Sequence, residues 1–190
     1  MGEIFFTSDT HFAHIPMFLW EPRGFSCVEE MNEAIIERWN KIVKPNDIVY
    51  HLGDTMLSNN EVGLECMKRL NGQIFLIFGN HETDNRKNLL FKECKNLYGG
   101  WYAYQIKHVK MIIYMSHYPT LTSNYDVEMN KHFTQHILNI CGHTHRKEKF
   151  LDEKNPFMYN ACLDAHNCYP VHIDDIITDC REQFLSLRGA

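Results

Sequence analysis

Short apolar runs alternate with polar blocks along this chain. The first run covers residues 3–8, and similar runs cover 47–52 and 73–78. Two more, at 111–115 and 137–140, lie in the second half of the chain. Apolar runs of this length, bounded by turn residues, are typical of buried β-strands. We therefore expect five buried strands, each followed directly by a polar block.

Helical periodicity fills much of the sequence between the first runs. Ser26-Cys27-Val28-Glu29 matches a capping box and predicts the start of a helix. The apolar residues that follow recur at helical spacing: Val28, Met31, Ile35, Trp39 and Ile42. Further helices are predicted around 58–71, around 86–96 and from about Asp174 onward. Strands that alternate with helices indicate an α/β fold.

The second half of the chain is richer in predicted strands. Residues 101–107 and 111–115 predict a hairpin, and a further strand is expected over 157–163. The segments 12–25 and 120–135 have no clear periodicity, so we expect loops there. The first loop leaves from a polar block, so it either contacts a substrate or packs on its own aromatic side chains. The second loop is expected beside the same site.

Size and cysteine usage restrict the class of protein. The 190 residues are enough for one domain, and we expect a single domain over 1–190. No apolar run approaches the roughly 20 residues of a membrane-spanning helix, and no secretion signal is visible. The seven cysteines are scattered without a C-x-x-C pair, which favours reduced thiols. These features predict a cytoplasmic protein that does not contact a membrane.

Charge and histidine content narrow the function further. The formal net charge is −5, whereas a general nucleic-acid binder normally presents a basic face. Long nucleic acids are therefore disfavoured as partners. The chain has 12 histidines, a high number for its length, and histidine is the commonest metal-ligating side chain.

The polar blocks after the strands contain the residues suited to metal binding. We expect the carboxyl ends of the strands to gather them at one site. Residues i and i+2 of an extended segment point the same way, so His143 and His145 are predicted to face that site together. The candidate ligands are two carboxylates, one amide and four imidazoles: Asp9, His11, Asp54, Asn80, His117, His143 and His145.

This ligand set is more than one ion needs. Two divalent ions that share a bridging carboxylate would use all of it. Mixed nitrogen and oxygen donors without thiolate suit manganese, iron, zinc or nickel better than magnesium. Two such ions clamp a phosphoryl group and activate a bridging water.

These blocks, in this order after their strands, resemble those of the calcineurin-like metallophosphoesterase superfamily. The resemblance spans residues 9–145 and is closest to the small, cap-less bacterial, archaeal and phage members. It implies a four-layered α/β/β/α sandwich with the metal site at the carboxyl ends of the strands.

The resemblance also implies roles for the matching residues. One metal would be bound by Asp9, His11 and His145, and the other by Asn80, His117 and His143, with Asp54 as the bridge. His81 matches the histidine that acts on the transition state or the leaving oxygen. Glu82 stands where the family often has Asp, which puts its contact with His81 in question.

The predicted function is metal-dependent hydrolysis of a small phosphodiester, nucleotide-like or other, by a metal-bridging hydroxide, with manganese as the favoured metal. His14 and Arg23 are candidates for contacting phosphate. If they hold a terminal phosphate, the chain is a phosphomonoesterase, such as a protein or nucleotide phosphatase. A nuclease of short substrates and a non-catalytic scaffold of the same fold are further alternatives. The remaining histidines are expected to be structural or exposed: His51, His108, His132, His136, His166 and His172.

Overall fold

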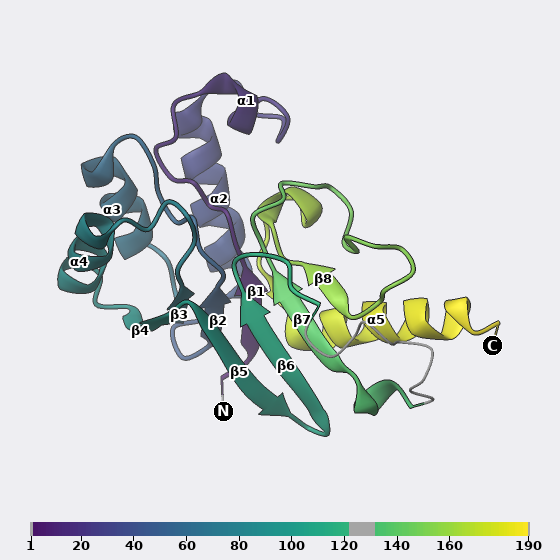
Figure 1. Cartoon of the computed structure of the whole chain (residues 1–190). Helices are drawn as coiled ribbons and strands as arrows, with labels where there is room; N and C mark the ends of the chain where they lie inside the picture. The colour runs from purple at the N-terminus through teal and green to yellow at the C-terminus, as the bar shows by residue number, and fades with distance from the viewer. Residues whose placement is uncertain (1, 122–131, 190) are drawn as a thin grey trace.

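The computed structural model describes residues 2–121 and 132–189, and it contains two β-sheets flanked by helices (Figure 1). The first sheet has the strand order β4-β3-β2-β1-β9 and the second β5-β6-β7-β8. The strands of the first sheet are β1 (Ile4–Thr7), β2 (Ile48–His51), β3 (Gln73–Ile77), β4 (Leu97–Trp101) and β9 (Val171–His172). Those of the second are β5 (Ala103–His108), β6 (Met111–Ser116), β7 (Ile137–Cys141) and β8 (Met158–Asn160).

The helices cover both sheets. They are α1 (Met17–Trp20), α2 (Val28–Ile42), α3 (Asn60–Lys68), α4 (Asp84–Glu93) and α5 (Ile173–Leu187), with short 3-10 turns η2 (Phe133–Gln135) and η3 (Leu163–Ala165). One hydrophobic core joins α2, α3 and α4 to the first sheet. A second core contains side chains from both sheets and from α5, which lies beside β7 and β8 (Figure 1). The predicted α/β/β/α sandwich is confirmed.

Alternating side chains on the central strands hold these layers together. In β1, Phe5 belongs to the helix-side core and Phe6 to the core between the sheets. In β2, Val49 likewise belongs to the helix-side core and Tyr50 to the core between the sheets. Strands β1, β2, β3 and β4 pair in parallel, as do β6, β7 and β8. Their carboxyl ends therefore meet at common edges, where the polar blocks begin.

The structure corrects several predicted elements. The capping box is displaced by one residue, because Cys27 is the N-cap of α2 and the Glu30 carboxylate accepts hydrogen bonds from Ser26. Strands β4 and β9 were missed, as was the short helix α1 within the predicted loop 12–25. Most of the predicted loop 120–135 lies outside the described residues, which resume at His132 and the turn η2.

Candidate active site

Left-handed backbone conformations aim the predicted ligands into one site. Five of the seven have positive φ: Asp9 (58°), His11 (46°), Asp54 (56°), His143 (71°) and His145 (51°). Aspartate and histidine tolerate this region better than most residues, and such strain gathers at functional sites. The prediction that His143 and His145 lie in an extended segment is therefore wrong. The turn sends their side chains to two different clusters.

The first cluster consists of Asp9, His11 and His145. Asp9 Oδ1 lies 3.6 Å from His11 Nε2 and 3.5 Å from His145 Nε2. These separations are too long for hydrogen bonds. The Asp9 Oδ1 atom and both His11 ring nitrogens are buried without a hydrogen-bond partner among the described residues.

The second cluster consists of Asp54, Asn80, His117 and His143. His117 Nδ1 lies 2.8 Å from the Leu52 carbonyl oxygen, so Nδ1 carries the proton and Nε2 presents a lone pair. The His117 Nε2 atom lies 3.0 Å from Asn80 Oδ1 and 3.1 Å from His143 Nδ1. The Asn80 oxygen is also an acceptor, so no proton is available between it and His117 Nε2.

One carboxylate oxygen lies between the two clusters. Asp54 Oδ2 is 3.7 Å from His11 Nε2 in the first cluster and 3.5 Å from His117 Nε2 in the second. The other oxygen, Oδ1, accepts a hydrogen bond of 2.9 Å from the His81 backbone N–H. Asp54 is thus oriented by the backbone so that one oxygen faces both groups of imidazoles.

The donor atoms fit cations. Two ligands at about 2.1 Å from a tetrahedral ion lie about 3.4 Å apart, close to the separations found in both clusters. Burial alone would raise the pKa of Asp9, but the facing His11 and His145 outweigh it and hold the pKa well below its usual range. Converging acceptors without protons between them are a poor arrangement unless a cation completes it. The His and Asp clusters are therefore arranged to hold divalent ions.

His81 borders the same site from the β3 end. Its Nε2 lies 3.9 Å from Asp54 Oδ2, and 36% of its side chain is exposed. Burial of the ring is the main cause that lowers the pKa of His81. The imidazole is therefore positioned to touch a bound molecule as well as the ligand cluster.

Glu82 supports the site through the backbone. Its carboxylate accepts hydrogen bonds from the N–H groups of Asp54, Thr55 and Gly79 at 2.8, 2.7 and 2.7 Å. The Thr55 hydroxyl donates a fourth, at 2.9 Å. The longer side chain thus ties the ends of β2 and β3 together.

Arg23 has a different environment from the one its candidate role requires. Only 1% of its side chain is exposed, and its guanidinium makes paired contacts of 3.0 and 2.7 Å with the Asp164 carboxylate. It also donates to the Asp9 carbonyl oxygen at 2.8 Å. This geometry leaves Arg23 no free face for a phosphate. His14, by contrast, lines the pocket over the clusters.

Asp164 is a site residue that the sequence reasoning missed. Its Oδ2 accepts a hydrogen bond of 3.0 Å from His145 Nδ1, which leaves the lone pair of His145 Nε2 facing Asp9. Burial would raise the pKa of Asp164, but His145 and Arg23 lower it to about 2. Asp164 lies in the turn η3, without a motif around it, so the sequence offered no signal.

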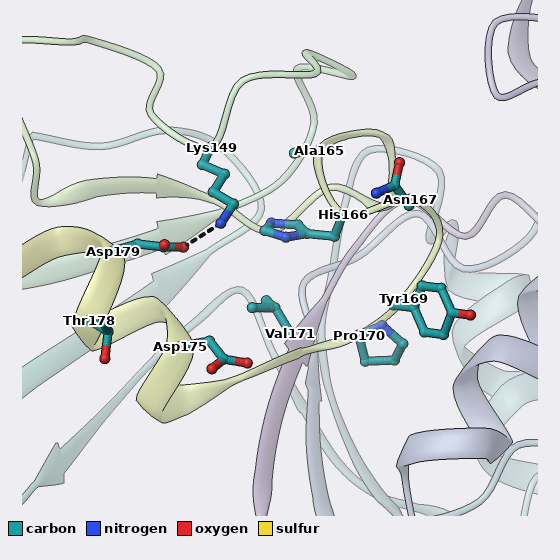
Figure 2. A pocket seen from close by; sticks show the side chains of 10 residues that line it. All are labelled: Lys149, Ala165, His166, Asn167, Tyr169, Pro170, Val171, Asp175, Thr178 and Asp179. Carbon is teal, nitrogen blue, oxygen red and sulfur yellow. Dashed lines mark hydrogen bonds and ion pairs between the residues drawn. The ribbon is translucent and has the colours of Figure 1, made fainter. Parts of the chain in front are cut away.

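Several hollows of similar size occur among the described residues. One, of about 490 Å³, lies over the clusters and is lined by His11, His14, Phe18, Leu19, Pro22, Asp54, Leu57, Asn80, His81, His143, His145 and Asp164. Another, of about 380 Å³, lies between the start of α5 and the loop that carries His166 (Figure 2). In it, Lys149 Nζ already pairs with Asp179 Oδ2 at 2.8 Å.

Comparison with known proteins identifies the family. The model of the calcineurin-like phosphoesterase family matches residues 2–158. An uncharacterized protein of Methanocaldococcus jannaschii is 33% identical over 185 residues, which cover 93% of this chain and 90% of that protein. The chain therefore belongs to the calcineurin-like phosphoesterase family, whose members hydrolyse phosphate esters.

A solved structure supports the fold. The crystal structure of a protein of unknown function from Aquifex aeolicus matches with a TM-score of 0.71 and 26% identity, over 94% of this chain and 99% of that one. A novel archaeal phosphodiesterase matches with a TM-score of only 0.45 and 16% identity, over 84% of this chain and 82% of that one. The second likeness is too weak to bear on activity. Among the described residues, no helix is long and apolar enough to cross a membrane.

Proposed function

We propose that this chain is a dinuclear metal-dependent phosphodiesterase. Asp9, His11 and His145 would hold one ion, and Asn80, His117 and His143 the other. Asp54 would serve both through Oδ2. The observation that carries this proposal is the set of acceptor atoms that face one another at 3.0–3.7 Å around two centres.

The protein's own side chains would supply binding and orientation. When bound, the two ions would neutralise the phosphoryl oxygens and activate water as the nucleophile. His81 extends from the pocket wall toward the same centre and would donate a hydrogen bond to the phosphoryl group or a proton to the leaving oxygen. Glu82 would keep Asp54 and His81 in position, because its carboxylate accepts hydrogen bonds from the N–H groups of Asp54 and Gly79.

Charge in the pocket favours a diester over a monoester. A monoester is a dianion near neutral pH, and its second charge calls for a cationic side chain. The described lining of the pocket contains no Lys or Arg. Arg23, which had suggested a phosphatase, is engaged by Asp164. A diester carries one negative charge, so it does not need a cationic side chain in the pocket lining.

The chemistry of the donor atoms and the thiols indicates the metal and the location. Mixed imidazole, carboxylate and amide donors suit manganese, with iron, zinc and nickel as alternatives. All seven cysteines are free thiols, which supports a reducing compartment such as the cytoplasm.

The test is hydrolysis of bis(p-nitrophenyl) phosphate and p-nitrophenyl phosphate side by side in Mn²⁺, with His81→Ala as the control. We expect the diester to be cleaved faster, and kcat to fall about 10²–10⁴-fold in the variant while metal content is unchanged. Faster cleavage of the monoester would make the chain a phosphomonoesterase. Hydrolysis of neither ester by a chain that also binds no Mn²⁺ would contradict both assignments and favour the scaffold.

A further inference from the structure

We propose that the apolar wall of the active-site pocket, centred on Phe18, binds a flat uncharged ring attached to the phosphate ester, either a nucleobase or an aryl group. This inference rests on the proposed phosphoesterase function and specifies its substrate class. The wall is formed by Phe18, Leu19, Pro22 and Leu57.

The pocket is lined by two chemically different groups of side chains. The ligand clusters and His81 contribute carboxylate, amide and imidazole groups. Apolar side chains of α1, its flanking loop and Leu57 line the same pocket. A phosphate held at the ligand clusters would therefore have apolar lining within the same pocket for one of its substituents. An uncharged substituent suits a wall whose described residues include no Lys or Arg.

Phe18 is placed for ring contacts. The side chain is 71% exposed although it lines the pocket, so a large apolar surface is in contact with water there. Its ring packs edge to face against the His14 ring, with the two ring centroids 5.5 Å apart. The centroids of the His14 and His11 rings are 5.3 Å apart. A line of rings thus leads from the solvent to the first ligand cluster. An aromatic face of this kind stacks on bases and aryl groups without regard to sequence.

The short helix beneath Phe18 is fixed in place. Leu19 is 5% exposed and belongs to the helix-side core, and the Trp20 indole donates to the Ile15 carbonyl oxygen at 2.9 Å. Phe25 N–H closes the segment by donating to the Trp20 carbonyl oxygen at 3.1 Å. The exposed ring is therefore presented by an anchored segment, and little ordering is required when a substrate arrives.

The experiment measures binding of three singly charged diester analogues, in each of which a stable P–C bond replaces one of the two ester bonds. O-methyl methylphosphonate has no ring, O-methyl phenylphosphonate has an aryl ring, and thymidine 5′-methylphosphonate has a nucleobase. Affinities are measured by calorimetry on the Mn²⁺-loaded protein and as inhibition constants against bis(p-nitrophenyl) phosphate. We expect the ring-bearing analogues to bind about tenfold more tightly than the ring-free one. Whichever ring-bearing analogue binds more tightly shows whether the wall binds a nucleobase or an aryl group.

Variants at Phe18 decide the assignment. Phe18→Ala should remove the tenfold preference and leave the ring-free analogue unaffected, while Phe18→Trp should retain it. Phe91→Ala is the matched control, because Phe91 is a partly exposed phenylalanine, 39% exposed, that does not line the pocket. Equal affinity of the wild type for all three analogues, or a preference that survives Phe18→Ala, would overturn the subsite.

The two proposals fail in distinguishable ways. Hydrolysis without ring preference would remove the subsite and leave the phosphodiesterase standing. Ring preference by calorimetry without hydrolysis of any ester would support the subsite and remove the enzyme. The absence of both binding and hydrolysis would contradict the two together.

Discussion

The hollow of Figure 2 and the pocket over the ligand clusters differ less in size than in the hydrogen bonding of their polar atoms. In the hollow of Figure 2, the Lys149 ammonium, the Asp179 carboxylate and the His166 ring already have partners. Lys149 and the Tyr159 hydroxyl both contact Asp179 Oδ2, at 2.8 and 2.6 Å, and His166 Nε2 donates to the Asn160 carbonyl oxygen at 2.8 Å. In the pocket over the ligand clusters, acceptors face acceptors and buried nitrogens lack partners.

This difference indicates which hollow binds a ligand. A buried polar atom without a partner costs about 1–3 kcal/mol, so a folded chain keeps several together only where something else completes them. Volume alone gives no such distinction, since the two hollows measure about 490 and 380 Å³.

Asp54→Asn should abolish both metal binding and hydrolysis. The substitution removes the negative charge from the one oxygen that faces both clusters, so neither ion keeps its full ligand set. Metal content measured by mass spectrometry and initial rates on the diester both report the result. Unchanged metal content together with unchanged turnover would refute the shared role of Asp54.

Asp164→Asn should weaken metal binding about 10–100-fold, because this carboxylate fixes the ring orientation of His145. The measurement is a Mn²⁺ titration. Glu33→Gln is the matched control, since it breaks an arginine–carboxylate pair of the same kind with Arg69 in an exposed position. Equal effects of the two substitutions would show that Asp164 contributes only general stability.

His51 should make the metal-free fold sensitive to acid. Gly53 N–H donates to His51 Nδ1 at 3.2 Å, so Nε2–H donates to the Thr10 hydroxyl at 3.0 Å, and this hydroxyl donates to the Thr55 carbonyl oxygen at 2.7 Å. Burial lowers the pKa of His51 to about 3. The network thus holds the turn between Asp9 and His11.

The sign of this pH effect follows from the neutral state of the folded ring. Its stabilising contribution is complete above the unfolded pKa of 6.5 and is lost as the pH falls toward about 3. The slope approaches about 1.4 kcal/mol per pH unit. Denaturant unfolding of the metal-free protein between pH 7 and 4 should show a steeper loss for the wild type than for His51→Gln. Parallel curves would contradict this account.

Asp179→Asn, in the hollow of Figure 2, should change neither metal content nor hydrolysis. It weakens the contacts with Lys149 and Tyr159, and we expect a loss of about 1 kcal/mol in the free energy of unfolding. Chemical denaturation and the diester assay measure the two quantities. A large loss of activity would show that this hollow also serves the reaction.

The sequence predicted the strands whose ends carry the site, because apolar runs closed by polar blocks are a local signal. It missed β4, whose Leu-Tyr-Gly-Gly-Trp sequence contains two glycines that weaken strand patterning. It also missed β9, since a strand of two residues has no pattern. Local sequence is sufficient where the element is long and regular.

Within the site, residue types were predictable and their geometry was not. The blocks identified the side chains that the structure brings together. The left-handed turns that separate His143 from His145 arise from contacts such as the hydrogen bond from His143 N–H to Asp9 Oδ2, which joins residues far apart in the sequence. Asp164 and its pairing with Arg23 depend on the same long-range packing.

The most direct test is to count bound manganese per chain in the wild type and in two variants, one for each cluster. We expect two ions in the wild type and one each in His145→Ala and His117→Ala, with the remaining ion in the other cluster. A single ion in the wild type, or a full complement of two in both variants, would contradict the dinuclear centre.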